Sequence, residues 1–184
     1  FAYLLVKVGD EDAVISGYSW KYTYVVSQLI ELIWLWVVVS MVSTAYIMST
    51  ERGALFLSVT SIIVNPTSED LANIATMTAN AVLMFGLNPV VAMVSYSNFG
   101  SSNFESASKV RKAVKYLHEN HPDLIVDGEV QADFALNRKL LKEMFPFSKL
   151  AGKKVNTLIF PNLDSANITY KLLKDLHGSD SIGP

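Results

Sequence analysis

In the second half of the chain, short apolar runs alternate with longer segments whose apolar residues recur at helical spacing. Three short apolar runs, each followed by small polar or acidic residues, are predicted to be buried strands: residues 90–95, 124–126 and 156–160. The segments after them are predicted to be helices: residues 104–119, 131–144 and 166–176. Strands that alternate with helices pair in parallel, so this pattern predicts an α/β layer structure.

A further helix, with signals at both ends, is predicted before the first of these strands. Asn65-Pro66 ends the preceding pattern, and Thr67 with Asp70 three residues later forms a variant of the capping box. The apolar face of this helix consists of residues at helical spacing: Leu71, Ile74, Ala75, Thr78, Val82 and Phe85. Gly86 suits the position just after the helix, where a left-handed conformation is common.

The first half of the chain has a less regular pattern. Strands are predicted at residues 2–8 and 13–17, followed by a helix at residues 21–34. Residues 37–48 and 54–64 are rich in β-branched side chains and are separated by a charged turn that ends in a glycine. These two segments predict a β-hairpin.

The segment 29–48 carries no charge from Leu32 onward and is long enough to suggest a transmembrane helix. Serine and threonine residues interrupt its second half, and only single charged residues flank it. A buried helix that runs into a buried strand is therefore preferred, and no membrane partner is expected. An exposed surface here, with Trp34 and Trp36, would favour a homo-oligomer; packing of both tryptophans in the core is the alternative.

Composition mainly excludes classes of function. The chain has 184 residues, 51% of them hydrophobic, and a net charge of −2, which predicts a sizeable core and argues against a nucleic-acid partner. Without cysteine there is neither a disulfide nor thiolate chemistry. None of His118, His121 and His177 has a second ligand at useful spacing, so no metal is expected. The chain begins inside a predicted strand and stops at a turn, which predicts a piece of a longer protein.

Small polar and acidic residues follow all three strands of the second half: Ser95 to Ser102, Asp127 to Asp133, and Asn162 to Asn167. The carboxyl ends of parallel strands lie on one edge of a sheet, where open α/β sheets bind ligands. Hydroxyls, amides and a glycine in the first loop offer donors to an anion, and the next helix adds the positive end of its dipole. This convergence predicts a ligand site, whereas capped turns without a ligand are the structural alternative.

The charged residues at this edge have two interpretations each. Asp127, Glu129 and Asp133 suit an acid/base pair, but carboxylates at strand ends are more often helix N-caps. The basic residues of the next helix suit a phosphate, but a solvated helix face is favoured for them: Lys109, Arg111, Lys112 and Lys115.

Three motifs in this order resemble the phosphotransacetylase (phosphate acetyl/butyryl transferase) family: Ser-Tyr-Ser-Asn-Phe-Gly-Ser-Ser at 95–102, Asp-Gly-Glu-Val-Gln-Ala-Asp at 127–133 and Ile-Phe-Pro-Asn-Leu-Asp-Ser-Ala-Asn at 159–167. The Ser-Asn-Phe-Gly-Ser form is most similar to the C-terminal phosphotransacetylase-like domain of NADP-dependent malic enzymes, and residues 9–17 fit the same branch. The resemblance implies a three-layer α/β/α fold with a mostly parallel sheet, incomplete at both ends. Residues 1–66 would belong to a first α/β subdomain and 67–184 to a second.

The resemblance also implies a function. Family enzymes exchange an acyl group between CoA and phosphate, and the malic enzyme domain resembles a regulatory module that senses acetyl-CoA and helps to assemble the oligomer. We expect a cytoplasmic, homo-oligomeric domain that binds acetyl-CoA or a related acyl-CoA beside a malate-oxidising catalytic domain; part of an active acyltransferase is the alternative. The residues expected to bind CoA or phosphate are Ser16, Gly17, Ser97, Asn98, Gly100, Ser101, Ser102, Asn162, Ser165 and Asn167.

The chain departs from the family pattern in ways that argue against catalysis. An arginine-containing segment is expected where Trp20 and Ser27 stand, and neither residue replaces a bidentate guanidinium. A turn, a glycine, an aspartate and an asparagine are replaced in the same region, by Val37-Val38, Thr44, Val59 and Ile63. The late Ser-Arg and Asp of the family would lie beyond Pro184. The resemblance therefore implies a binding domain rather than a complete acyltransferase site.

Overall fold

The computed structural model describes residues 2–12, 24–25, 27–28, 44–51, 53–59, 63–177 and 181–183. The chain divides into two compact units, Phe1–Ser40 and Met41–Pro184. The first unit contains α1 (Ala2–Val8). The second unit contains, in chain order, β1 (Thr44–Thr50), β2 (Gly53–Val59), α3 (Ser68–Met84), β3 (Val90–Val94), α4 (Glu105–Asn120), β4 (Ile125–Val130), α5 (Ala132–Leu136), α6 (Arg138–Met144), β5 (Thr157–Ile159), α7 (Leu163–His177) and β6 (Ser181–Ile182).

The described strands form one sheet in the order β4-β3-β5-β2-β1-β6. β4, β3, β5 and β2 pair in parallel, whereas β1 pairs antiparallel with β2 and with β6. The mostly parallel sheet and the β1–β2 hairpin confirm two predictions from the sequence pattern. Because β2 and β5 are neighbours, this sheet crosses the subdomain boundary expected at residue 66, and that boundary stays a prediction.

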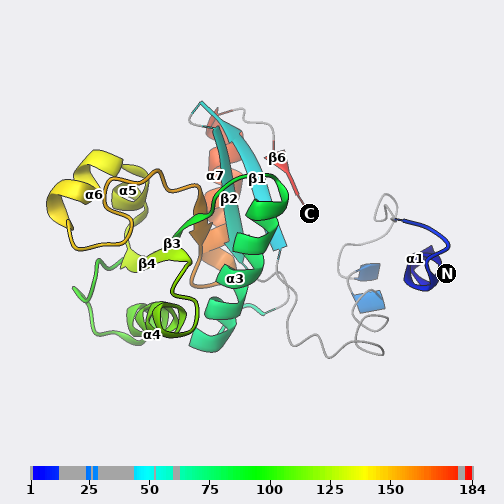
Figure 1. Cartoon of the computed structure of the whole chain (residues 1–184), viewed down its shortest axis with the longest axis horizontal. Helices are drawn as coiled ribbons and strands as arrows, with labels where there is room; N and C mark the ends of the chain where they lie inside the picture. Colours follow the sequence, from blue (N-terminus) through cyan, green and yellow to red (C-terminus); the bar gives the residue numbers. More distant parts are fainter. Residues whose placement is uncertain are drawn as a thin grey trace. The chain divides into compact units, whose positions relative to one another are not determined.

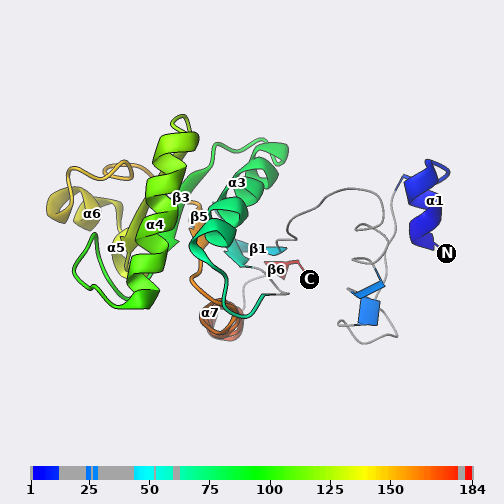
Figure 2. The same cartoon turned by 90° about the horizontal axis from the view of Figure 1, so that it is seen from below.

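Helices cover both faces of the sheet, which confirms the three-layer α/β/α fold. Side chains alternate along β3: Val91 and Met93 pack with α3 and α4, whereas Ala92 and Val94 pack with α5, α6 and α7. Figures 1 and 2 show α3 and α7 on opposite sides of the strands. Each layer therefore buries one face of β3, the strand that leads into the loop 97–102.

Both ends of α3 have the predicted structure. Asp70 N donates to Thr67 Oγ1 at 3.2 Å, and Thr67 N donates to Asp70 Oδ2 at 2.8 Å, which completes the capping box. Gly86 has a φ of +72°, and its amide donates to Leu83 O at 2.9 Å. The left-handed glycine satisfies a carbonyl at the helix end and turns the chain toward β3.

Three predicted elements differ from the structure in type or extent. Residues 2–8 form the helix α1 and not a strand, because a run this short has no period that separates the two. The helix predicted over 131–144 is two helices, since the Asn137 side chain accepts from Leu140 N at 3.1 Å and begins a new one, α6. The turn predicted after residue 180 includes β6, which pairs with β1.

Several predictions fall on residues outside the described ranges. They include the strand at 13–17, most of the helix at 21–34, and the part of the apolar segment before residue 44 with its two tryptophans. Ser16 and Gly17 also lie outside the described ranges, so the structure gives no position for them as ligand residues. Within the residues that are described, no helix is both long and apolar enough to cross a membrane.

Strand β4 is longer than predicted and contains two charged residues. The sequence pattern ends this strand at Val126, but β4 continues to Val130, with Asp127 and Glu129 buried inside it. Between the two carboxylates, Gly128 has a φ of +149°, and a Cβ there would lie 2.5 Å from Met93 O. Only glycine allows β4 to approach β3 at this point.

We expect Gly128→Ala to lower the free energy of unfolding by about 3 kcal/mol or more, since the methyl group meets backbone and the φ is unfavourable. Gly152→Ala is the matched control, because Gly152 also has a positive φ of +74° but a Cβ there would have only Lys142 Cδ nearby, at 3.6 Å. That variant should lose about 1 kcal/mol. Urea unfolding of the full chain measures both, and equal losses would contradict the close approach.

Candidate functional site

Three loops leave the same edge of the sheet, because β4, β3 and β5 are parallel neighbours. Hydrogen bonds join the first two loops: Gln131 N donates to Asn98 Oδ1 at 2.7 Å, and Gln131 Nε2 donates to Tyr96 O at 2.6 Å. Lys109 Nζ, on α4, donates to Pro161 O at 3.0 Å and connects the third loop. The convergence predicted from the sequence is confirmed, while its use as a ligand site stays a prediction.

The loop 97–102 is built around the carboxylate of Glu129, which is fully buried in β4. Ser97 Oγ and Gly100 N donate to Glu129 Oε1 at 2.9 and 2.8 Å. Phe99 N donates to the backbone carbonyl of Glu129 at 2.7 Å. Phe99 and Gly100 have φ values of +44° and +93°, so the chain turns around the carboxylate through two left-handed residues.

The other amides of this loop also donate within it. Asn98 N donates to Ser101 Oγ at 3.0 Å, and Ser101 N donates to Asn98 O at 3.0 Å. Ser102 N donates to Ser97 Oγ at 3.1 Å. Every backbone amide from Asn98 to Ser102 therefore has an acceptor in the loop 97–102 or in Glu129. The sequence offered these amides as donors to an anion, but here they hold the loop together, so ligand contacts have to come from side chains.

Polar side chains remain on the outside of the loop. Asn98 Oδ1 accepts from Gln131, but within the described part of the chain no group accepts from Asn98 Nδ2. Tyr96 OH and Ser102 Oγ share a hydrogen bond of 2.8 Å on the exposed side, and Ser101 is exposed beside them. An amide donor and hydroxyls are thus available to a ligand in front of a rigid turn.

Arg111 reaches back from α4 onto the same loop. Its Nη2 donates to Ser102 O at 2.7 Å, and its Nε lies 3.7 Å from Glu129 Oε2. Glu129 Oε2 is buried and makes no hydrogen bond among the described residues, so this ion pair is its main compensation. Gly100 has a φ of +93°, which favours glycine, and a Cβ there would lie 2.9 Å from Arg111 Nη1 and push the guanidinium aside. The solvated face predicted for the basic residues is wrong for Arg111.

The three lysines of α4 differ from Arg111 in position. Lys109 Nζ donates to Asn65 Oδ1 at 2.7 Å in addition to Pro161 O, and burial lowers the pKa of Lys109 below its usual value against the opposing pull of nearby carboxylates. Lys112 and Lys115 are exposed, and Lys115 Nζ lies 3.9 Å from Glu119. The predicted solvated face is confirmed for these last two residues.

The carboxylates of β4 have structural partners. Asp127 Oδ2 accepts from Ser148 Oγ and Lys149 N, both at 2.8 Å, and its Oδ1 lies 3.8 Å from His118 Nε2. Asp127 and Glu129 are therefore neither helix N-caps nor acids open to a substrate. Asp133 is exposed in the first turn of α5. Groups of three or more metal-binding side chains are absent from the described residues.

The loop after β5 has the structure of a helix cap. Asn162 Oδ1 accepts from Ser165 N at 2.9 Å, and Ser165 Oγ donates to Asn162 O at 2.9 Å. Asn167 lies half-buried within α7, which begins at Leu163 and not at 166 as predicted. These contacts match the structural alternative of a capped turn, and a ligand contact of these residues stays a prediction.

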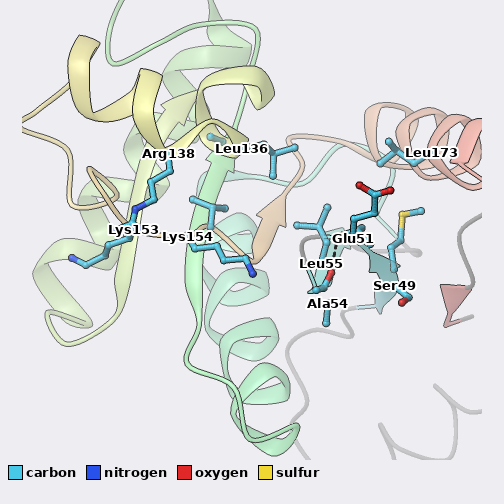
Figure 3. Close-up of a pocket in the computed structure, with 14 residues that line it drawn as sticks. Ser49, Glu51, Ala54, Leu55, Leu136, Arg138, Lys153, Lys154 and Leu173 are labelled. Atoms are coloured by element: carbon cyan, nitrogen blue, oxygen red, sulfur yellow. Dashed lines mark hydrogen bonds between the residues drawn. The ribbon is translucent and has the colours of Figure 1, made fainter.

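A cavity of about 800 Å³ lies at the other ends of the strands, beside the first residues of β2 and the segment before β5 (Figure 3). Arg138, Lys153 and Lys154 line it, together with apolar side chains such as Leu55 and Leu173. None of the expected ligand residues that the structure describes is among its lining residues. These cations were not predicted as site residues, although two adjacent lysines precede a buried strand in the sequence.

The chain is similar to malic enzymes and to phosphate acetyltransferases. The family described as phosphate acetyl/butaryl transferase matches residues 1–184. The NAD-dependent malic enzyme of Rhizobium meliloti is 39% identical over 181 residues, which cover 98% of this chain and 23% of that protein. The phosphate acetyltransferase of Treponema pallidum is 37% identical over 194 residues, which cover 100% of this chain and 57% of that protein.

A solved phosphotransacetylase from Streptococcus pyogenes has a TM-score of 0.84 and 31% identity, over 98% of this chain and 55% of that chain. The chain thus spans about a quarter of the malic enzyme and a little over half of the phosphate acetyltransferase and the solved structure.

We expect Glu129→Ala to lower the free energy of unfolding by about 3 to 5 kcal/mol, because it leaves Ser97 Oγ and Gly100 N without an acceptor and Arg111 without its counter-charge. Glu129→Gln keeps an acceptor oxygen and should lose less. Asp133→Ala, at an exposed carboxylate, should stay within about 0.5 kcal/mol of the parent chain. Chemical unfolding of the full chain measures the free energy of unfolding of each variant. If Glu129→Ala is as stable as Asp133→Ala, the buried carboxylate does not hold the loop.

Proposed function

Because this chain belongs to the phosphate acetyl/butyryl transferase family, we propose that it binds acetyl-CoA or a related acyl-CoA and does not turn it over. The matching segment makes up 23% of the malic enzyme of R. meliloti, which supports a place for this domain beside a malate-oxidising catalytic domain. In that setting the domain senses the acyl-CoA and contributes to the assembly of a cytoplasmic homo-oligomer.

One observation carries the proposal: the loop 97–102 is held in shape by the buried Glu129 at the carboxyl edge of parallel strands. Ligands of open α/β sheets bind at this edge, and donors that are fixed in advance lose little freedom on binding. Asn98 Nδ2 and the hydroxyls of Tyr96 and Ser102 face outward from this turn. They suit the phosphate and amide groups of a CoA thioester.

The engagement of the carboxylates supports binding without turnover. Acyl transfer between CoA and phosphate needs a group that takes up or releases a proton at the reacting atoms. Both oxygens of Asp127 accept from protein groups, Oδ2 from Ser148 and Lys149 and Oδ1 from Gly128 N. Glu129 is fully buried beneath the loop. Within the segment 95–102 itself, the side chains left available to a ligand are an amide and hydroxyls.

Part of an active phosphate acyltransferase is the second candidate. The similarity to the T. pallidum phosphate acetyltransferase over 57% of that protein favours it. The two candidates separate in one assay of the full-length protein, which measures acetyl phosphate formed from acetyl-CoA and inorganic phosphate. Turnover that requires this domain would replace the first proposal with the second.

We expect the full-length protein to bind acetyl-CoA in isothermal titration calorimetry, and Asn98→Ala to weaken that binding about tenfold. Asn98→Asp keeps the oxygen that accepts from Gln131 N but replaces the amide donor with a negative charge, so it should weaken binding at least as much. Lys112→Ala, at an exposed residue of α4, should change the affinity less than about twofold.

The absence of heat at millimolar acetyl-CoA with the parent protein would overturn the proposed function. Equal effects of Asn98→Ala and Lys112→Ala would remove the assignment of the ligand to the loop 97–102.

A further inference from the structure

Arg111 is the cation that lies against the loop 97–102. We infer that its guanidinium contacts a phosphate group of the bound CoA thioester, an inference that rests on the proposed function and names the residue that gives the site its preference for anions. Three properties suit Arg111 to this contact: its position on the loop, its unused donors and its fixed orientation.

The position of Arg111 follows from its contacts. The guanidinium donates to Ser102 O at 2.7 Å and packs against Gly100, where a Cβ would lie 2.9 Å away. The side chain is 34% exposed, so part of it is accessible to solvent beside the loop, whereas Glu129 is not. A ligand that contacts Asn98 and Ser102 comes within reach of it.

The guanidinium has donors left for a ligand. Arginine carries five N–H groups in a planar fork that matches two oxygens of a phosphate. Among the described residues, Ser102 O is its one hydrogen-bond acceptor, and Nε faces Glu129 at 3.7 Å. The amides of the loop are already occupied, so this fork supplies charge-assisted donors that the backbone does not.

Glu129 gives Arg111 a fixed orientation. Its Oε1 accepts from Ser97 and Gly100, which leaves Oε2 to the guanidinium alone. A flexible arginine loses side-chain freedom when it meets a ligand, whereas one held by an ion pair and a carbonyl has lost that freedom on folding. Glu129 is therefore a positioning residue for Arg111, and it stays behind the loop, out of contact with the ligand.

The lysines of the same helix do not have these properties. The ammonium of Lys109 donates to Asn65 Oδ1 and Pro161 O and so connects α4 to the loop after β5. Lys112 and Lys115 are exposed, and among the described residues no hydrogen bond or ion pair joins either of them to the loop 97–102. Lys112 carries the same charge as Arg111 one position along the chain, which makes it a matched control.

The test is the affinity of the full-length protein for acetyl-CoA, measured by calorimetry at low and at high salt. We expect Arg111→Met to weaken binding about tenfold or more at low salt. At high salt the ratio of the dissociation constants of variant and parent should be smaller, because salt screens the charge. Arg111→Lys should recover part of the loss because it keeps the charge. Lys112→Met should stay within about twofold of the parent at both salt concentrations.

Other results overturn the assignment of Arg111. A loss under about twofold for Arg111→Met shows that the guanidinium does not contact the ligand. If Arg111→Lys does not recover the affinity that Arg111→Met loses, and high salt does not reduce that loss, Arg111 only supports the loop. Binding of acetyl-CoA by the parent protein in either case leaves the proposed function standing, whereas no binding by the parent overturns the proposed function itself.

Discussion

The shape of the loop 97–102 depends on the hydrogen bonds and the ion pair of the buried Glu129 carboxylate. Removing a carboxylate from water costs several kilocalories per mole unless the group is both paired and hydrogen-bonded. Ser97, Gly100 and Arg111 supply these partners, and all of them belong to the loop or to the helix that follows it. The loop cannot change its shape without leaving that charge uncompensated, so the corner is tied to the sheet.

Two glycines allow these groups to come together. Gly128 lets β4 approach β3, since a Cβ there would lie 2.5 Å from Met93 O. Gly100 turns the chain with a φ of +93° and leaves room for Arg111 Nη1. Both positions combine a positive φ with a close neighbour, so the backbone and the charge pair set the geometry together.

The sequence was sufficient for elements whose signals are local. A capping box and Gly86 mark the ends of α3, and small polar residues mark the ends of β3 and β5. It was not sufficient for β4, because Asp127 and Glu129 look like loop residues until their partners, 21 and 32 positions away, are known. The local sequence pattern also does not show that backbone amides of the loop donate to Glu129. Nor does it show that Arg111 contacts the loop while the neighbouring Lys112 does not. Ligand binding by all of the expected site residues stays a prediction, and residues 16 and 17 also lie outside the described ranges.

A corner of this kind suits recognition better than proton transfer. Catalysis by acid and base needs a side chain whose proton reaches the substrate, and the oxygens of Asp127 and Glu129 face protein donors. Recognition needs donors that are already in place. Arg111 and Glu129 have opposite charges, but the arginine side chain is 34% exposed and the glutamate is fully buried, so an anion meets the positive partner at contact and the negative one at a greater distance. Because Coulomb energy falls with distance, the pair that shapes the loop also favours a phosphate in front of it.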